Sequence, residues 1–504
     1  METALVTPLD EFNQALLANV HPPGWVNPEP KPWYHLVVVG AGAGGLMAAI
    51  GAASVGARVA IVERALLGGD CLTVGCVPSK SLIRSSRAVR EVERAERLGV
   101  PVSGVPQPDF GAVMRRMRRL RSQISENDSV HRLTALGVDV FLGQGAFTAP
   151  RTLEVDGKRL QFKKAVIATG GGPFVPPIPG LEEAGYRTNE TLFDLTELPR
   201  RLLVLGAGPI GSELAQAFRR FGSEVTVVAK DPDFLPREDA DAAQILRRQF
   251  EREGIAFHFE ATLSKVERAG AAKRAVVSGQ GEERTLEVDE ILVAVGRVAN
   301  FGELGLEAAN VAVENRRVRV SPTLRTSNPR IYAVGDVCLP LQFTHLSGTT
   351  GMLAVRNALF RGRNRWTDLV VPWCTYTEPE IAHVGMYERE AKAQGLRVDT
   401  FVRHLAKVDR ASLDGDDEGF VKIHVRKGSD RILGATIVAR HAGEMISELT
   451  LAINAGIGLK RVVATIHPYP TQSEAIQQTG GAYYRSKLTP FTRRLLGFLL
   501  RLLN

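Results

Sequence analysis

Two copies of one nucleotide-binding motif constrain the fold of this 504-residue chain more than any other feature. Each copy combines an apolar strand, a G-x-G-x-x-G turn and a following helix. The motif glycines are Gly40, Gly42 and Gly45 in the first copy and Gly206, Gly208 and Gly211 in the second. Such glycines let the backbone approach a pyrophosphate at the N-terminus of the helix. Two copies predict an α/β fold with two Rossmann-like dinucleotide-binding domains.

The residue that ends the second strand of each copy bears on the dinucleotide that binds there. In the first copy this strand ends at Glu63, whose carboxylate is expected to accept a hydrogen bond from a ribose hydroxyl. At the corresponding position, counted from the first glycine of each motif, the second copy has Ala229 followed by Lys230. The missing acid and the adjacent cation favour a ribose that carries a 2′-phosphate. We therefore expect the second site to prefer NADPH, with NADH as the alternative.

A pair of cysteines follows the first motif, in the string GGDCLTVGCVPSK at residues 68–80. Cys71 and Cys76 can close a small disulfide loop if the backbone brings their α-carbons within about 7 Å. The residues after Ser79 are predicted to form a helix, so Cys76 lies just before a helix N-terminus, where the dipole favours a thiolate. A metal-binding pair is the weaker interpretation, because C-x4-C is not a usual zinc spacing.

This string resembles the redox-active disulfide segment of the FAD-dependent pyridine nucleotide-disulfide oxidoreductases, among them dihydrolipoamide dehydrogenase, glutathione reductase and mercuric reductase. The resemblance implies that the first dinucleotide is FAD and that Cys71 and Cys76 form a redox disulfide. It gives Cys76 the position beside the flavin and gives Cys71 the attack on the substrate. It also pairs Lys80 with Glu213 close to the flavin and the nicotinamide, where the pair tunes hydride transfer.

Three shorter strings extend the resemblance along the chain. An A-T-G string with Thr169 and Gly170 is similar to the family's strand beneath the FAD. Gly296 closes the predicted nicotinamide domain, and Asp336, in a V-G-D string, corresponds to the aspartate that binds the ribityl part of FAD. These four residues are therefore expected to bind cofactors.

The C-terminal part resembles the family's dimerisation domain and implies an obligate homodimer, whose active sites use the end of this domain from the partner. In disulfide reductases that end carries an acid/base histidine directly before P-T-x-S-E. Here the string 466–474 is IHPYPTQSE, so that Tyr469 takes the histidine's position, His467 comes two residues earlier, and Glu474 is the orienting acid. A tyrosine with a pKa of about 10 is a poor proton relay near neutral pH. Mercuric reductases carry a tyrosine at this position.

The substrate is less constrained than the electron path. Mercuric reductases also use a C-terminal cysteine pair, whereas no cysteine follows Cys374, and their N-terminal metal-binding domain is expected to be absent. We expect an enzyme that passes electrons from NADPH to a thiophilic acceptor, Hg(II) or a similar ion. One alternative is a dihydrolipoamide-type or other small disulfide substrate, with His467 as the base. Another is an electron carrier docked on a membrane or a protein.

Composition and the chain ends bear on location and partners. The formal net charge of +8 suits phosphate-bearing ligands or anionic lipid and does not by itself indicate nucleic acid. Four cysteines without a signal peptide predict a cytoplasmic protein, with association at the cytoplasmic membrane face as an option. Residues 490–504 are apolar with three arginines and too short to span a bilayer. They are predicted to lie on an anionic membrane, to dock on a protein or to pack on their own dimer.

The sequence thus predicts two dinucleotide-binding domains and a C-terminal α+β dimerisation domain, without a metal site. Two long helices are expected within residues 79–135, and the basic run at 114–121 is interpreted as a solvated face rather than an anion site. Trp25 and Trp33 are expected to dock on the folded body. The predicted parts are an N-terminal extension (1–34), a FAD-binding domain in two segments (35–190 and 301–370), an NAD(P)H-binding domain (191–300), a dimerisation domain (371–484) and a basic amphipathic tail (485–504).

Overall fold

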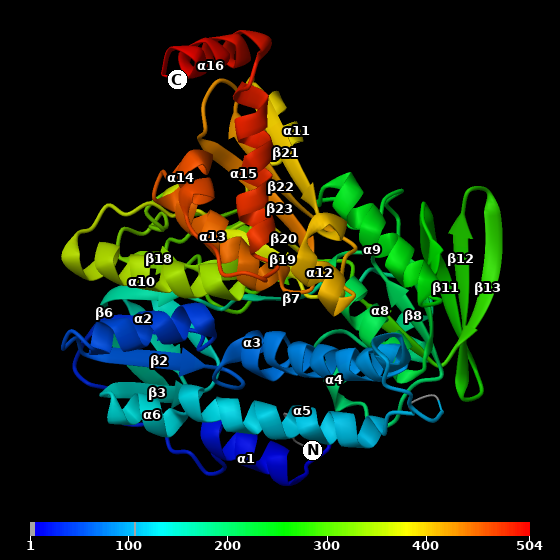
Figure 1. Ribbon diagram of the computed structural model, residues 1–504. Helices are drawn as coiled ribbons and strands as arrows, with labels where there is room; N and C mark the ends of the chain where they lie inside the picture. The colour runs from blue at the N-terminus through cyan, green and yellow to red at the C-terminus, as the bar shows by residue number, and fades with distance from the viewer. Residues whose placement is uncertain (1–5, 105–106, 504) are drawn as a thin grey trace. The chain divides into compact units, whose positions relative to one another are not determined.

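The computed structural model describes residues 6–104 and 107–503. Residues 1–5 of the predicted extension and Asn504 of the predicted tail lie outside the described residues. The chain forms two compact units (Figure 1). The first unit contains residues up to 232 and residues 253–368, and the second contains residues 233–252 and 369–504. The predicted assignment of domains within these units stays a prediction.

The first nucleotide-binding motif lies in a sheet with the strand order β3-β2-β1-β6-β5-β4, in which β18 also pairs with β6. The strands are β1 (Tyr34–Val39), β2 (Val59–Glu63), β3 (Val138–Leu142), β4 (Gly145–Ala149), β5 (Thr152–Val155), β6 (Lys158–Ile167) and β18 (Ile331–Ala333). Strands β1, β2, β3, β6 and β18 run parallel. Val37 and Val38 are fully buried, which explains why β1 is an unbroken apolar run. Helix α2 (Ala43–Ala53) begins at the carboxyl end of β1, where parallel sheets bind ligands.

The second motif lies in a parallel sheet with the order β10-β9-β8-β14. Its strands are β8 (Arg201–Leu205), β9 (Glu224–Val228), β10 (Ala256–His258) and β14 (Glu290–Val293). Helix α8 (Pro209–Phe221) begins at the motif, and proline at its first position suits a helix start. Three smaller sheets complete the unit: β11 (Ala261–Ala269), β12 (Ala272–Gly279) and β13 (Glu282–Val288); β7 (Gly171–Pro173) and β15 (Arg297–Ala299); and β16 (Val313–Glu314) and β17 (Arg317–Val318).

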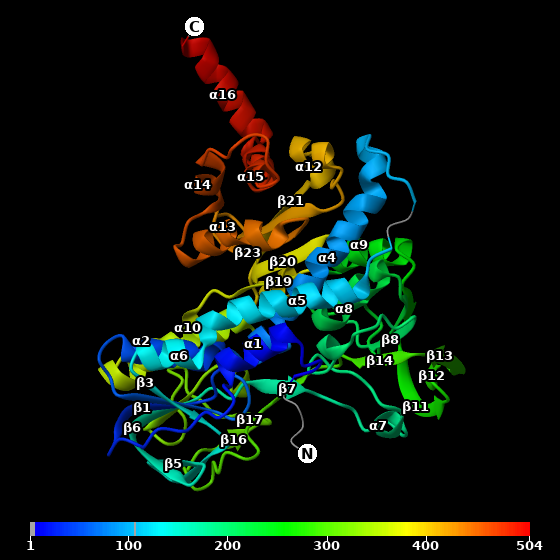
Figure 2. The same cartoon turned by 90° about the horizontal axis from the view of Figure 1, so that it is seen from below.

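Two long helices, α4 (Cys76–Arg94) and α5 (Phe110–Ser125), run side by side in the first unit (Figures 1 and 2). They confirm the prediction of two long helices, and the short α6 (Val130–Ala135) follows them. Asp109 ends the loop before α5 and caps the helix, because its carboxylate accepts from the backbone amide of Ala112 at 3.0 Å. Helices α3 (Gly69–Thr73), α7 (Leu181–Ala184) and α10 (Thr344–Phe360) also lie in this unit.

The N-terminal extension lies on the body of the first unit. It contains α1 (Glu11–Val20) and a proline-rich stretch without regular structure. The indole of Trp25 donates to the carbonyl oxygen of Val140 in β3 at 3.3 Å. The ring of Trp33 faces the guanidinium of Arg58 at 3.4 Å and the ammonium of Lys163 at 4.0 Å. The predicted docking of both tryptophans is confirmed.

The basic run at residues 114–121 is only partly the solvated face that its sequence predicted. Arg118 and Arg121 are 6% and 1% exposed. Arg118 forms an ion pair with Asp10 at 2.6 Å, and Arg121 donates to the amide oxygen of Asn13 at 2.8 Å. The prediction is wrong for these two arginines, because the helical spacing of α5 does not reveal that α1 covers them.

The second unit is built on an antiparallel sheet with the order β19-β20-β23-β22-β21. Its strands are β19 (Pro372–Thr375), β20 (Glu380–Gly385), β21 (Val398–His404), β22 (Phe420–Arg426) and β23 (Ile432–Ala439). Its helices are α9 (Ala240–Arg252), α11 (Glu388–Ala393), α12 (Asp409–Asp414), α13 (Ala442–Asn454), α14 (Leu459–Ala464), α15 (Glu474–Lys487) and α16 (Pro490–Leu503). Val421, Ile423 and Ile437 are fully buried in its core. Helices and an antiparallel sheet in one unit agree with the predicted α+β class.

Candidate active site

The two cysteines of the redox string lie on consecutive short elements. Cys71 is in α3, and α4 begins at Cys76 itself rather than after Ser79, with Gly75 as its N-cap. Gly69 has a φ of +57°, and a Cβ there would lie 2.7 Å from the α-carbon of Gly42. A side chain at residue 69 would therefore push the cysteine segment away from the first nucleotide-binding turn. This close approach brings the cysteine segment next to that turn.

The structure contains Cys71 and Cys76 as free thiols, and their surroundings make them unequal. The hydrogen bond from Cys71, together with Thr344 and the positive charge of Lys80, lowers the pKa of Cys76 to about 5. The Cys76 sulfur lies 3.4 Å from the hydroxyl oxygen of Thr344, and its place at the start of α4 adds the helix dipole. The same hydrogen bond and burial raise the pKa of Cys71. These opposite shifts favour a thiolate on Cys76 and a thiol on Cys71.

Lys80 and Glu213 form the ion pair that the resemblance implied. Lys80 Nζ lies 2.7 Å from the Glu213 carboxylate, and the Glu213 side chain is 7% exposed. Lys80 lies one helical turn after Cys76 in α4, so its charge also acts on the thiolate. Glu213 lies in the first turns of α8, two residues after Gly211. The pair therefore joins the helix of the redox string to the helix of the second nucleotide-binding motif.

The first nucleotide-binding turn has the shape that a pyrophosphate needs. Gly40 has a φ of +97°, and a Cβ there would lie 2.4 Å from the carbonyl oxygen of Ala168. At Gly45 a Cβ would lie 1.8 Å from the carbonyl oxygen of Gly40, whereas at Gly42 the nearest atom is 3.8 Å away. The Glu63 carboxylate accepts from the backbone amides of Ala41 at 2.7 Å and Ala65 at 2.9 Å. Glu63 thus holds the turn itself, in addition to the ribose contact expected of it.

The second turn repeats this geometry. A Cβ on Gly206 would lie 2.5 Å from the carbonyl oxygen of Ala294, and a Cβ on Gly211 would lie 2.1 Å from that of Gly206. Gly208 is the N-cap of α8, and a Cβ there would meet no atom within 4 Å. Past the end of β9, Ala229 is buried and Lys230 is exposed. The cation is accessible to a phosphate, which fits the predicted preference for NADPH.

Two of the predicted cofactor residues, Gly296 and Asp336, lie beside Arg297, which was not predicted from the sequence. Asp336 lies 3.8 Å from the Arg297 guanidinium, and burial raises the pKa of its carboxyl. Arg297 also bonds to the carboxylate of Asp70, next to Cys71. Arg297 directly follows Gly296, which was predicted as a cofactor residue. This position next to Gly296 is the signal by which the sequence could have identified Arg297. Arg297 therefore connects the cysteine segment to the predicted flavin aspartate.

Thr169 and Gly170 lie in the turn after β6. The Thr169 hydroxyl donates to the carbonyl oxygen of Asn300 at 2.5 Å, and the Asn300 amide donates to the carbonyl oxygen of Gly170 at 3.0 Å. These bonds tie the turn to the residues after β15. Their predicted role in FAD binding stays a prediction.

The predicted acid/base residues lie in the second unit, and the structure pairs them differently from the prediction. Tyr469 is 69% exposed and donates to the Asp409 carboxylate at 3.0 Å, which raises the pKa of the phenol. His467 Nε2 lies 3.0 Å from the carboxylate of Glu448. Glu474 accepts from Gln478 at 2.9 Å. The carboxylate that contacts His467 is that of Glu448 in α13, for which the local motif gives no signal. The predicted acid/base roles of Tyr469, His467 and Glu474 stay predictions.

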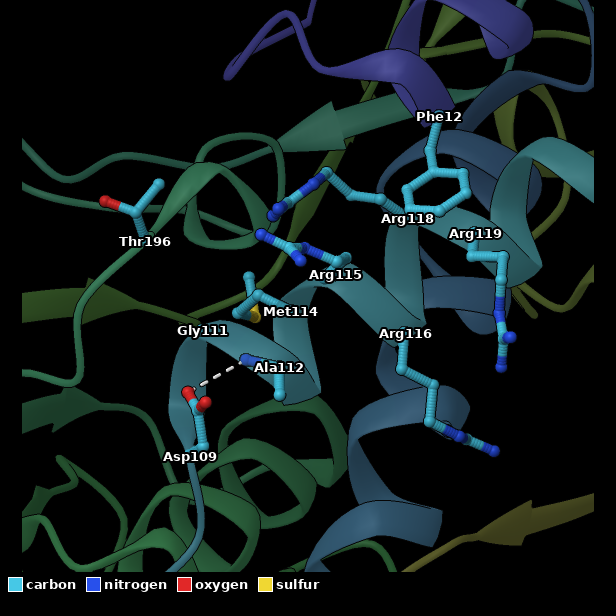
Figure 3. Close-up of a pocket in the computed structure, with 10 residues that line it drawn as sticks. All are labelled: Phe12, Asp109, Gly111, Ala112, Met114, Arg115, Arg116, Arg118, Arg119 and Thr196. Carbon is cyan, nitrogen blue, oxygen red and sulfur yellow. Dashed lines mark hydrogen bonds between the residues drawn. The ribbon is translucent and has the colours of Figure 1, made fainter.

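A surface hollow of about 610 Å³ lies along the basic helix α5 (Figure 3). Arg115, Arg116, Arg118 and Arg119 line it and point in different directions. Arg116 donates to the backbone and hydroxyl of Ser81, and Arg118 pairs with α1 as described above. Two of the four arginines therefore hold neighbouring helices together, and the lining includes none of the predicted redox or nucleotide residues.

Comparisons with known proteins decide the family. Residues 34–362 match the family described as pyridine nucleotide-disulphide oxidoreductase, and residues 371–479 match its dimerisation domain. The chain belongs to the pyridine nucleotide-disulphide oxidoreductases. The family is FAD-dependent and uses NAD(P)H, and the glycine turns described above fit two dinucleotides. The predicted family, fold class and cofactors are confirmed, and the dimerisation domain supports a homodimer.

Individual relatives within the family have different activities. The chain is 34% identical to a mercuric reductase of Lysinibacillus sphaericus over 88% of this chain and 81% of the relative. It is also 34% identical to a dihydrolipoyl dehydrogenase of Thermus scotoductus, over 90% of this chain and 98% of the relative. The Cu(II) complex of the HOCl-induced flavoprotein disulfide reductase RclA from Escherichia coli has a TM-score of 0.80 with 29% identity, over 90% of this chain and all of that one. Identity alone therefore does not select the acceptor.

Proposed function

We propose that this oxidoreductase uses NADPH to reduce a thiophilic acceptor, Hg(II) or a similar soft metal ion, at Cys71 and Cys76. The observation that carries the proposal is the placement of two free cysteines, Cys71 in α3 and Cys76 at the start of α4, with Thr344 and Lys80 beside Cys76, which favours a thiolate there. Thiolates are preferred ligands of soft metal ions. A ready thiolate with a second sulfur beside it can bind such an ion from two sides.

The proposed step balances with the residues at hand. The two sulfurs join in a disulfide as the Cys71 proton leaves to solvent, and the two electrons released reduce one Hg(II) to Hg(0) or two Cu(II) to two Cu(I). With FAD held at the first nucleotide-binding turn, the two electrons of NADPH would be available to reopen the disulfide. Lys80, held by Glu213 at 2.7 Å, keeps a positive charge beside Cys76 and so favours its return as a thiolate.

Proton demand distinguishes a metal ion from a disulfide substrate. Reduction of a disulfide produces two thiolates that must be protonated, so a group that donates protons near neutral pH speeds the reaction. Reduction of a metal ion requires no proton for the product. The bond to Asp409 raises the pKa of Tyr469 further above neutrality, which makes this residue still poorer as a proton donor and supports the metal ion.

One observation favours a second candidate, reduction or oxidation of a dihydrolipoamide-type substrate. His467 and Glu448 form a pair at 3.0 Å, and a histidine oriented by a carboxylate is a common acid/base device. The similar identity to a dihydrolipoyl dehydrogenase supports the same reading. In this candidate, His467 does the proton transfer that Tyr469 cannot do.

Turnover of purified holoenzyme with NADPH separates the candidates. We expect NADPH oxidation with thiol-complexed Hg(II) or with Cu(II) to exceed that with lipoamide or glutathione disulfide. Cys71→Ser and Cys76→Ser should abolish it, while Cys338→Ser and Cys374→Ser serve as matched controls that retain it. Faster turnover of lipoamide than of the metal ions, together with loss of lipoamide turnover in the His467→Gln enzyme, would overturn the metal-ion proposal in favour of the second candidate. Full activity of Cys71→Ser would exclude both.

A further inference from the structure

The last helix, α16, has no role in the proposed electron path. It spans Pro490–Leu503, and none of its 14 residues is buried. In both views it extends from the end of α15 away from the five-stranded sheet of the second unit (Figures 1 and 2). The match to the dimerisation domain ends at residue 479. Helix α16 therefore follows the part of the chain that the family shares.

The side chains of α16 separate into two faces at 100° per residue. Arg493, Gly497, Arg501 and Arg494 lie within an arc of about 100° around the helix. The opposite side carries Phe491, Leu495, Phe498 and Leu502, which are 76%, 46%, 60% and 65% exposed. Leu496, Leu499, Leu500 and Leu503 widen the apolar face to about 200° of the circumference, with Leu500 next to Arg493, and they are exposed as well. Such a face is wider than the narrow stripe by which one helix packs on another.

The charged side chains of the segment that follows Glu474 are all basic. No acidic residue follows Glu474 in the chain, whereas the basic residues Arg485, Lys487, Arg493, Arg494 and Arg501 do. The first two end α15 and lie close to the start of α16 in sequence. A partner of this segment is therefore expected to be anionic as well as apolar.

We propose that α16 lies in the surface of an anionic lipid bilayer and holds the enzyme there. A broad apolar face beneath a cationic face is the pattern of helices that lie in the plane of the interface, with arginines at the headgroups. At 1.5 Å per residue the helix is about 21 Å long, which is less than the bilayer core of about 30 Å. No helix in the part of the chain that the structure describes is long and apolar enough to cross a membrane. The helix therefore lies on the bilayer.

Vesicle flotation of the full holoenzyme tests this placement. We expect the enzyme to float with vesicles of phosphatidylcholine mixed with phosphatidylglycerol, and to stay at the bottom with phosphatidylcholine alone or at high salt. Truncation after Thr489, or the double change Phe498→Ser with Leu502→Ser, should remove flotation. Arg493→Glu with Arg494→Glu should reduce the bound fraction at least about tenfold. Arg115→Glu with Arg119→Glu makes the same charge change on the exposed face of α5 and should leave binding unchanged.

Turnover and mass measurements complete the test. The truncated enzyme should keep its NADPH oxidation in solution, because α16 contains none of the redox or nucleotide residues. Equal flotation of the full and truncated enzymes would overturn the proposal. So would an absence of flotation combined with a larger particle mass for the full chain than for the truncated one, because a second copy would then be the occupant of the apolar face.

Discussion

Arg121 offers the sharpest test of how the N-terminal extension acts on the redox segment. Its guanidinium is 1% exposed and donates to the carbonyl oxygen of Thr73, the last residue of α3, at 2.6 Å. It also donates to the side-chain oxygen of Asn13 in α1 at 2.8 Å. Both acceptors are buried, so Arg121 links the helix of Cys71 to the extension. Removal of Arg121 leaves both acceptors without this donor.

The expected magnitude follows from these two bonds. A hydrogen bond from a charged donor contributes roughly 1.5–3 kcal/mol, and a buried neutral acceptor left without its donor costs about 1–3 kcal/mol. Burial lowers the pKa of Arg121 to about 10. Desolvation of the charge therefore offsets part of the stabilisation that the two hydrogen bonds provide. We expect Arg121→Ala to lower the free energy of local opening of α1 and α3 by roughly 3 kcal/mol.

Hydrogen exchange measures this local opening directly. Amides of α1 and α3 should exchange more than about a hundredfold faster in Arg121→Ala, and the Cys71 thiol should become easier to alkylate. Arg119→Ala removes an exposed arginine of the same helix and should change exchange little. Asn13→Ala should loosen α1 more than α3, because the bond to Thr73 remains. Unchanged exchange in α3 of Arg121→Ala would refute the link between the extension and the redox helix.

Three further predictions concern the cofactor and the thiolate. Lys230→Glu should lower kcat/KM for NADPH at least about tenfold relative to NADH, by loss of an attraction to the 2′-phosphate and gain of a repulsion; an unchanged ratio in steady-state assays would contradict the assignment of Lys230. Alkylation of Cys76 in the reduced enzyme should rise with pH through a midpoint of about 5 and be level at neutral pH, because the thiolate forms above that pKa; a midpoint at the ordinary thiol value would exclude this account. Lys80→Met should move the midpoint to higher pH, whereas Arg84→Met, an exposed change on the same helix, should not.

Local sequence patterns predicted helices and strands well where the apolar residues of the pattern are also the buried residues. Each nucleotide-binding motif has the predicted strand before its glycines and the predicted helix after them, β1 with α2 and β8 with α8, because the apolar residues of the strands are the buried ones. The Lys80–Glu213 ion pair followed from two family strings far apart in the chain. In both cases the residues themselves carried the information.

Contacts between distant segments without a shared motif were not predictable. The burial of Arg121 depends on α1, whose sequence gives no sign of its place on α5. Glu448 bonds to His467 because α13 passes beside it, whereas the nearby motif acid Glu474 bonds to Gln478 within its own helix. Thr344 reaches Cys76 from the start of α10. A hydrophobic pattern indicates which face of a helix or strand is buried. It does not indicate which polar group of a distant segment contacts that face.

The bonds that Glu63 makes to Ala41 and Ala65 have a consequence for the apoprotein. The first nucleotide-binding turn is held by the chain's own carboxylate and by the tight packing at Gly40 and Gly45. The conformational entropy that is lost when the turn becomes ordered is therefore lost during folding and not when the cofactor binds. The apoprotein is accordingly a preorganised receptor, and reconstitution with FAD should be a simple bimolecular association that requires no refolding of the turn.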